Sequence, residues 1–308
     1  MRPRLRDFIE TKEGWIFSVV DYHNEDGVHC LLRYLPGRPD GERERNGVRY
    51  KKMGFDEAYE FIRRERPEWI KGVMVVPYDH VSRLYQPHDG LLSIVGSDPR
   101  VKKMVAALPG VEFCDMGITG SKLVGLGAET SDVDFIVYGN SWFKARDELQ
   151  KAIAAGRIDG IDEAGWEKIY AKRKPELSFE EFYQHERRKG NRCLLDGALT
   201  DLLYVRDYDQ IGPVLPVGND LGMRTITATV TDAEFAYDSP AIYKVDHPEI
   251  SMVLSYTHTY AGQARKGEVI EARGRLEESS MGKVLVIGTS REPKGEWIKS
   301  LTLLEQPR

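Results

Sequence analysis

The N-terminal part of the chain alternates between apolar and polar positions, as β-strands do when one face is buried. Residues 15–20 and 28–34 follow this period of two, and the turn residues 24–27 between them end in Asp-Gly, which favours a hairpin. A third short run covers 48–51, and residues 55–64 then place apolar side chains at helical spacing. The pattern predicts a β-β-β-α unit at the start of the chain.

The middle of the chain alternates between helix and strand patterns. Ser97-Asp98-Pro99 is typical of a helix start, because a capping residue precedes a proline at the first helical position, and we expect this helix to end near Leu108. The elements expected after it are, in order, a strand at 111–118, a short helix at 122–126, a strand at 133–138, helices at 141–155, 162–174 and 178–189, and a strand pair at 192–195 and 200–205.

Helical patterns nearly disappear after residue 220. Short strand-like runs separated by Gly-rich turns take their place, at 225–230, 252–257, 268–276 and 283–289. This change predicts a small closed or half-closed β domain. We therefore expect an α+β protein with three domains, namely an N-terminal α+β extension at 1–75, a core at 76–222 and a small all-β domain at 223–308.

The strand predicted at 133–138 carries two carboxylates at its start. Asp132 and Asp134 are two residues apart, so both side chains leave the strand on the same side, while Val133 points the other way. Carboxylates this close repel each other, and burial raises the pKa of at least one of them. A divalent cation removes the repulsion, and Mg²⁺ combines a few carboxylates with water and phosphate oxygens. The pair predicts a metal site, although Asp132 could instead cap a turn.

Gly120-Ser121, at the start of the short helix, forms a second candidate element. Glycine lets the backbone approach a ligand closely, and backbone amides at a helix start attract an anion such as a triphosphate. The Ser121 hydroxyl can donate to a phosphate oxygen. The alternative is an ordinary strand-to-helix turn with a serine cap. The Asp-x-Asp pair follows eleven positions after Ser121 (132 − 121), and this combination favours the phosphate-binding interpretation.

Together these residues resemble the signature of the DNA polymerase β-type nucleotidyltransferase superfamily. Gly120-Ser121 is followed by ten residues and then by Asp132-Val133-Asp134, and the stretch 200–205 resembles the later strand that carries the third carboxylate, here Asp201. The match covers roughly the middle third of the chain, and the whole chain also resembles an archaeal group of predicted nucleotidyltransferases. The resemblance implies a polymerase β-like core, in which a mixed sheet has helices on one side.

The resemblance also implies an activity. Asp132, Asp134 and Asp201 would be catalytic residues that hold two Mg²⁺ ions, for which Mn²⁺ can substitute, and Asp201 would accept the proton of the attacking hydroxyl. Gly120 and Ser121 would bind the phosphates of an NTP such as ATP. The nucleotide would pass to a hydroxyl of RNA, a small molecule or a protein, with release of pyrophosphate.

Other interpretations of the same residues stay open. The chain could be a non-catalytic protein that binds a nucleotide or RNA, or a metal-dependent phosphodiesterase. Asp196 lies close to Asp201 and could replace it, but Gly197 marks a turn there, so Asp201 is the better candidate. A basic run (Arg187, Arg188, Lys189 and Arg192) could contact phosphate or form a solvated helix end, because cations favour a helix C-terminus.

Composition narrows the class of protein. The 308 residues are 41% hydrophobic with a net charge of −5, which suits packed domains and argues against a globally basic nucleic-acid coat. The three cysteines form no CxxC pair, so neither a zinc site nor a disulfide framework is expected. No apolar run has the length of a membrane span, and the start lacks a signal-peptide pattern, so we expect a cytoplasmic protein without a membrane partner.

Overall fold

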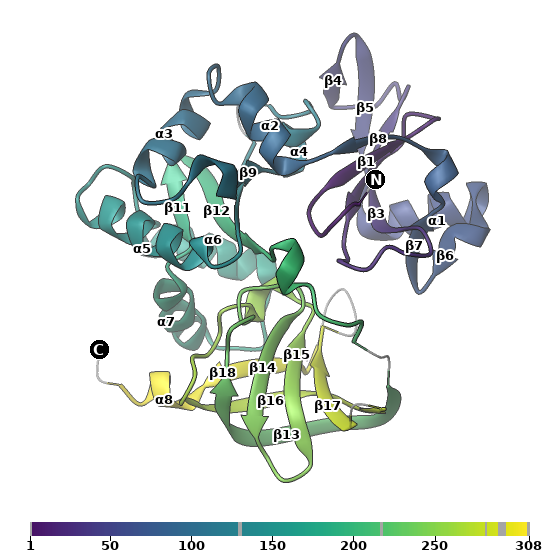
Figure 1. Ribbon diagram of the computed structural model, residues 1–308. Helices are drawn as coiled ribbons and strands as arrows, with labels where there is room; N and C mark the ends of the chain where they lie inside the picture. Colours follow the sequence, from purple (N-terminus) through teal and green to yellow (C-terminus); the bar gives the residue numbers. More distant parts are fainter. Residues whose placement is uncertain (1, 129–130, 216–217, 281, 289–293, 307–308) are drawn as a thin grey trace. The chain divides into compact units, whose positions relative to one another are not determined.

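The computed structural model describes residues 2–128, 131–215, 218–280, 282–288 and 294–306, and it has a mixed α+β architecture (Figure 1). Its contacts divide the chain into two compact units. One comprises Met1–Asp159 with Asn191–Gly212, and the other comprises Gly160–Gly190 with Pro213–Arg308. The domain boundaries expected after residues 75 and 222 stay predictions, because a grouping by contacts does not test which segments fold independently.

The first unit begins with an eight-stranded sheet that is larger than the predicted β-β-β-α unit. Its strands are β1 (Phe8–Thr11), β2 (Ile16–Val19), β3 (Val28–Pro36), β4 (Arg43–Arg45), β5 (Val48–Lys52), β6 (Ile70–Lys71), β7 (Val73–Val76) and β8 (Val81–Tyr85). The order is β4-β5-β3-β2-β1-β8, with β7 paired to β3 and β6 to β7. One face packs on α1 (Phe55–Glu65), the predicted helix, and buries Phe17, Leu32 and Trp69.

A β-bulge in β3 changes which side chains face each side of this sheet. Phe17 pairs with Leu32 and Ile16 with Tyr34, so Arg33 is one residue in excess. Leu32 belongs to the cluster on the α1 side, whereas Tyr34 joins a cluster on the other side. Without the bulge, residues 32 and 34 would share a face.

The core of the first unit is a second, mixed sheet, as predicted. It contains β9 (Met116–Ile118), β10 (Val133–Tyr138), β11 (Arg192–Leu195) and β12 (Ala198–Val205) in the order β11-β12-β10-β9. Strands β10 and β12 are parallel, and the other two pairs are antiparallel. The strand expected at 111–118 is wrong in its first half, where a 3-10 turn (Phe113–Asp115) precedes β9.

The α-helices that follow α1 in the first unit are α2 (Pro87–Ile94), α3 (Pro99–Ala107), α4 (Gly120–Leu123) and α5 (Ser141–Ala154). Asp98 caps α3 as predicted, since its side chain accepts hydrogen bonds from the amides of Arg100 and Val101. Helix α5 packs on β10 and β12, where the Trp142 indole donates to the carbonyl of Leu202 at 3.3 Å. On the opposite face of the sheet, Ile136, Tyr138, Leu203 and Val205 pack against Leu5 and Tyr22 of the N-terminal segment.

The second unit is a small β-barrel with helices packed on it. Its strands are β13 (Asn219–Asp232), β14 (Ala241–Asp246), β15 (Ile250–Ser255), β16 (Val269–Ser279), β17 (Gly282–Ile287) and β18 (Trp297–Ser300). The order is β13-β14-β15-β17-β16-β18, and β13 also pairs with β16, which closes five strands into a barrel. The predicted helices are confirmed as α6 (Glu163–Arg173) and α7 (Phe179–Lys189), and α8 (Leu301–Leu304) follows β18.

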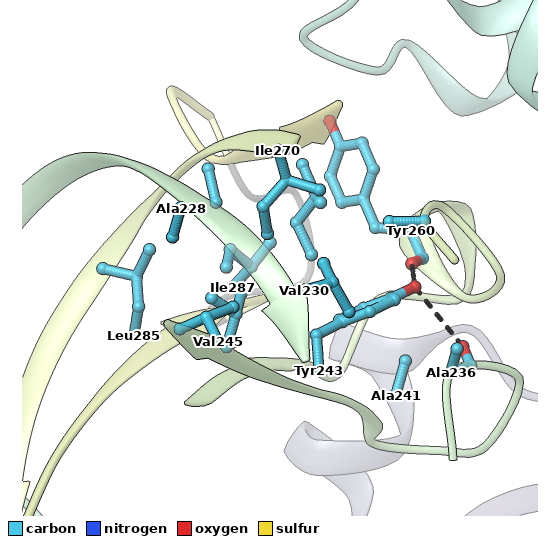
Figure 2. Packing of buried hydrophobic residues seen from close by; sticks show 14 of the residues in the cluster. Ala228, Val230, Ala236, Ala241, Tyr243, Val245, Tyr260, Ile270, Leu285 and Ile287 are labelled. Carbon is cyan, nitrogen blue, oxygen red and sulfur yellow. Dashed lines mark hydrogen bonds between the residues drawn. The ribbon is translucent and has the colours of Figure 1, made fainter. Parts of the chain in front are cut away.

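Buried aliphatic and aromatic side chains fill this barrel (Figure 2). Tyr243 lies among them, and its hydroxyl donates to the carbonyl of Tyr260 at 2.7 Å, with the carbonyl of Ala236 at 3.4 Å. Trp166 and Phe182, from α6 and α7, belong to the same core. The two helices are therefore part of the folded unit that contains the barrel.

Two sequence expectations about the whole chain can be compared with these elements. None of the described helices is long and apolar enough to cross a lipid bilayer. All three cysteines carry free thiols, of which Cys30 and Cys193 are buried and Cys114 is exposed.

The N-terminal segment contains a buried carboxyl with an unusual pKa. Asp7 is 1% exposed, and its Oδ2 accepts a hydrogen bond from the Arg4 amide at 3.0 Å, whereas Oδ1 has no partner among the described residues. Burial raises the pKa of Asp7 to about 7. The hydrogen bond from the Arg4 amide and the positive charge of Arg4 lower this pKa, and the negative charge of Asp89 raises it further. Because the pKa is higher in the folded state, this group stabilises the fold fully only below its unfolded pKa, and the stabilisation is lost as the pH rises through about 7.

We therefore predict that Asp7→Asn removes the loss of folding stability that ionisation of Asp7 causes as the pH rises. Unfolding in urea should show the variant more stable than wild type at pH 8, by up to about 4 kcal/mol, and close to wild type at pH 4. Glu60→Gln, an exposed change on α1, serves as the control and should leave the pH profile of stability unaltered. A variant with the same pH profile as wild type would contradict the assignment.

Candidate functional site

The sheet register brings two of the predicted carboxylates side by side. Asp134 in β10 pairs with Asp201 in β12, and because the strands are parallel and in register, both side chains leave the same face of the sheet. This is the face opposite helix α5, on which Ile136 and Leu203 also lie. Asp132 is exposed and immediately precedes β10. Residues 67 positions apart in the chain (201 − 134) thus meet on one surface.

Gly120 lies directly against Asp134. Its φ is +68°, a conformation that favours glycine, and a Cβ at this position would collide with the Asp134 carboxylate. The amide of Thr119 donates to the Asp134 carbonyl at 2.9 Å, which fixes the two segments together. Helix α4 begins at Gly120, two residues earlier than predicted, so Ser121 is in its first turn. The structure therefore places Gly120 against Asp134, with Ser121 as the next residue of α4.

The electrostatics of Asp134 reflect a concentration of negative charge. The side chain is half-buried, and this burial, followed by the charges of Asp201 and Asp132, raises its pKa to about 6. The positive charges of Arg6 and Arg33 lower this pKa. Like charges on one surface are costly in the absence of a cation, and this is the arrangement expected where a cation or cationic group binds.

Asp201 already has a cationic partner. Arg192 lies opposite it in the antiparallel pair β11–β12, and the guanidinium Nε donates to Oδ1 of Asp201. In the part of the chain that the structure describes, no group of three His, Cys, Asp or Glu side chains is arranged to hold a metal ion. The carboxylate oxygens are the ligand type that Mg²⁺ takes, and Gly120 leaves room at Asp134, so the residue types fit this ion. Binding by Asp201 requires its ion pair with Arg192 to adjust.

Sequence reasoning missed the arginines around these carboxylates. Arg6 precedes β1 and Arg33 is the bulge residue of β3. Arg43, in β4, donates from Nη1 to the Ser131 hydroxyl at 3.0 Å, next to Asp132. No local motif marks them, because they come from a sheet formed by the first 85 residues and only the fold brings them to the core.

The basic run of the sequence has other partners. In the second unit, Arg188 forms an ion pair with Glu268 at 2.5 Å, and the buried Lys189 pairs with Glu186 at 2.5 Å. Arg187 lies over the ring of Tyr183, with its guanidinium carbon 5.4 Å from the ring centroid. These contacts support the folded structure of that unit, and Arg192 belongs to the first unit beside Asp201.

A hollow of about 510 Å³ lies beside α4. Its lining residues are Ile94, Ser97, Asp98, Pro99, Arg100, Lys122, Gly125 and Gly127. The Lys122 ammonium forms an ion pair with Asp98 at 2.5 Å within it. None of the five predicted site residues is among these lining residues, so the chemistry of the carboxylates, and not this hollow, defines the candidate site.

Comparison with known proteins finds a relative, but the name of that relative states no activity. The chain is 35% identical to a protein of Methanocaldococcus jannaschii that bears the name uncharacterized protein MJ1086. The alignment of 337 positions covers 97% of this chain and 99% of that protein. The two proteins belong to one family. No family model matches the chain, and no solved structure matches it.

We predict that Gly120→Ala is more damaging than a change at an open glycine of similar conformation. Gly156 has a φ of +67°, and no atom of a described residue lies within 4 Å of the position that its methyl group would take. Gly156→Ala should therefore cost only the free energy of the unfavourable backbone conformation, about 1–2 kcal/mol. Gly120→Ala should cost about 1–3 kcal/mol more, because the methyl group displaces the Asp134 carboxylate. Equal losses in urea unfolding would show that Gly120 does not contact Asp134 closely.

We further predict that Asp134→Asn stabilises the metal-free protein at alkaline pH. The folded pKa of about 6 lies above the unfolded value, so ionisation costs stability as the pH rises through that range. In the presence of a chelator, the variant should gain up to about 3 kcal/mol at pH 8 and nearly nothing at pH 4. Asp132→Asn, at the exposed neighbour, should gain less. Destabilisation by Asp134→Asn at pH 8 would contradict the inferred charge repulsion.

Proposed function

We propose that this protein is a metal-dependent nucleotidyltransferase with a polymerase β-like core, which transfers a nucleotide from an NTP to a hydroxyl acceptor. The observation that carries the proposal is the pairing of Asp134 with Asp201 on one sheet face, with Gly120 against the Asp134 carboxylate. Adjacent parallel strands that each present an aspartate, beside a Gly-Ser turn, agree with the motif resemblance. The mixed β11-β12-β10-β9 sheet also agrees with it.

In this proposal each residue has a defined task. Asp132, Asp134 and Asp201 would hold Mg²⁺ or Mn²⁺, which supplies charge neutralisation for the entering and leaving oxygens when bound. Gly120 leaves space for a phosphate at the backbone, and the Ser121 hydroxyl donates to a phosphate oxygen. Asp201 accepts the proton of the acceptor hydroxyl as its oxygen bonds to the α-phosphorus. The bond from that phosphorus to the β-phosphate oxygen breaks, and pyrophosphate leaves.

The acceptor is defined only by class, as a hydroxyl of RNA, a small molecule or a protein. The closed barrel of the second unit favours a polymeric or bulky acceptor, because small closed β modules often bind oligonucleotides. This step rests on analogy between folds. ATP is the NTP with which we would begin.

A second candidate is a non-catalytic nucleotide- or RNA-binding protein that keeps the fold. The observation in its favour is the ion pair of Arg192 with Asp201, which gives the third acid a structural role. A cationic side chain at this position competes with a metal ion for the same carboxylate. The two candidates differ in whether label is transferred from an NTP.

The test incubates the protein with each NTP labelled at the α-phosphate, Mg²⁺ or Mn²⁺, and total RNA, protein or small-molecule extracts. We expect transfer of label by wild type and a loss of at least about a hundredfold with Asp134→Ala, since transition-state charge is then unbalanced. Asp196→Asn is the matched control, because Asp196 is exposed, has a φ of +49° that Asn tolerates, and should retain transfer.

Three results would overturn the proposal. Transfer that survives Asp134→Ala would refute the assigned site. Bound nucleotide without transfer under any condition would favour the non-catalytic protein. Cleavage of RNA without pyrophosphate release would favour a phosphodiesterase.

A further inference from the structure

Two arginines of the N-terminal region are carried by segments that pack against the elements of the acidic surface. The Arg6 carbonyl accepts a hydrogen bond from Thr119, the residue before the Gly-Ser turn. Arg33 is the neighbour of Tyr34, which packs with the segment that follows this turn. The positive charges of both arginines also lower the pKa of Asp134. Neither arginine forms a side-chain hydrogen bond or an ion pair with another described residue, and the Arg6 Nε is buried without a partner. An arginine in a partly buried setting normally has an acceptor, because its desolvation is costly.

The backbone is irregular at both arginines. Arg6 has a φ of +71°, which is rare for a residue with a side chain, and it lies in a turn just before β1. Arg33 is the extra residue of the β3 bulge. Bulges beside functional sites redirect a side chain, and strained backbone conformations concentrate at such sites. Each irregularity changes the direction in which an arginine leaves the chain.

Contacts with the core fix the turn that carries Arg6. The Thr119 hydroxyl donates to the Arg6 carbonyl at 2.6 Å, and Thr119 directly precedes Gly120. Leu5, the neighbouring residue, packs on Ile136 and Leu203, which share their sheet face with Asp134 and Asp201. The turn is therefore held over the face that carries the carboxylates.

Arg45 shows what an arginine with a structural role looks like in the same sheet. Its guanidinium donates to Glu10 at 2.7 Å, to the hydroxyls of Tyr50 and Tyr85 at 2.8 Å each, and to the Val124 carbonyl at 3.2 Å. With these four acceptors, the Arg45 guanidinium holds the sheet against the end of α4. Arg6 and Arg33 lack any comparable set among the described residues, so packing does not account for them.

A ligand that satisfies both groups of charges must carry anionic oxygens and accept a cation at the same time. A polyphosphate with its divalent cation has this chemistry, because the cation meets the carboxylates and the remaining phosphate oxygens meet the guanidinium groups. We propose that Arg6 and Arg33 bind the polyphosphate of the donor nucleotide, so that the N-terminal sheet and the core sheet together form the donor site. This inference rests on the proposed function and names the ligand of that site.

The test measures equilibrium binding of ATP, AMP and inorganic tripolyphosphate to the full chain with Mg²⁺. Arg6→Gln and Arg33→Gln should each weaken binding of ATP and tripolyphosphate by about tenfold to a hundredfold, as loss of a charge-assisted hydrogen bond implies, and change AMP binding by less than about threefold. Arg33→Lys should recover part of the affinity. Arg63→Gln on α1 removes the same charge at an exposed site and should leave all affinities within about twofold.

Thermal unfolding of each variant shows whether it is folded, and the Lys variants replace any Gln variant that is not. If Asp134→Ala weakens ATP binding but both arginine variants bind like wild type, the proposed function stands and this inference fails. If tripolyphosphate binding depends on the arginines while no NTP supports transfer, the arginines bind polyphosphate and the proposed function fails. Weakened binding of a single-stranded RNA oligonucleotide with unchanged ATP binding would assign the arginines to an acceptor and overturn the inference, as would a wild type that binds none of the three phosphates.

Discussion

The parallel pairing of β10 with β12 is the constraint on which the rest of the first unit depends. Once Val133 pairs with Thr200, Asp134 must stand beside Asp201, and two carboxylates share a surface that burial makes unfavourable for charge. Several neighbouring residues reduce this repulsion between the carboxylates or give them room. Arg192 pairs with Asp201, and Gly120 gives Asp134 space. The positive charges of Arg6, before β1, and Arg33, in β3, lower the pKa of Asp134. Stability alone would not select such a cluster, because apolar residues could fill the same positions at lower cost.

The N-terminal sheet is packed on both of its faces. Its α1 face encloses a hydrophobic core of its own, while its other face packs on the segment from Leu123 to Leu126 that follows the Gly-Ser turn. The sheet therefore determines where α4 lies, and it also contributes charge beside Asp134. Contacts within the first unit bring residues 2–85 and the core together, so that charges from both parts act on Asp134.

Much of the core was predictable from sequence because its signals are local. The strand at 133–138, the cap at Asp98 and the strand pair around Asp196-Gly197 each depend on a few neighbouring residues, and all are confirmed. Short strands such as β1 and β8 gave too little periodicity to be recognised, and they gain their stability from partners far away in sequence. The same limit applies to the site. A sequence motif was enough to predict that Asp134 and Asp201 lie together. The positions of Arg6 and Arg33 depend on a left-handed turn and a bulge, which no local sequence pattern predicts.

The bulge also has an evolutionary consequence. Because alternation along a strand has a period of two, the extra residue Arg33 is what lets Leu32 and Tyr34, two positions apart in the chain, face opposite sides of the sheet. A chain that lost this residue would keep both faces but would present no side chain at the bulge. Relatives that preserve the site should therefore keep the extra residue of β3, whereas the loops at either end of the strand should vary in length.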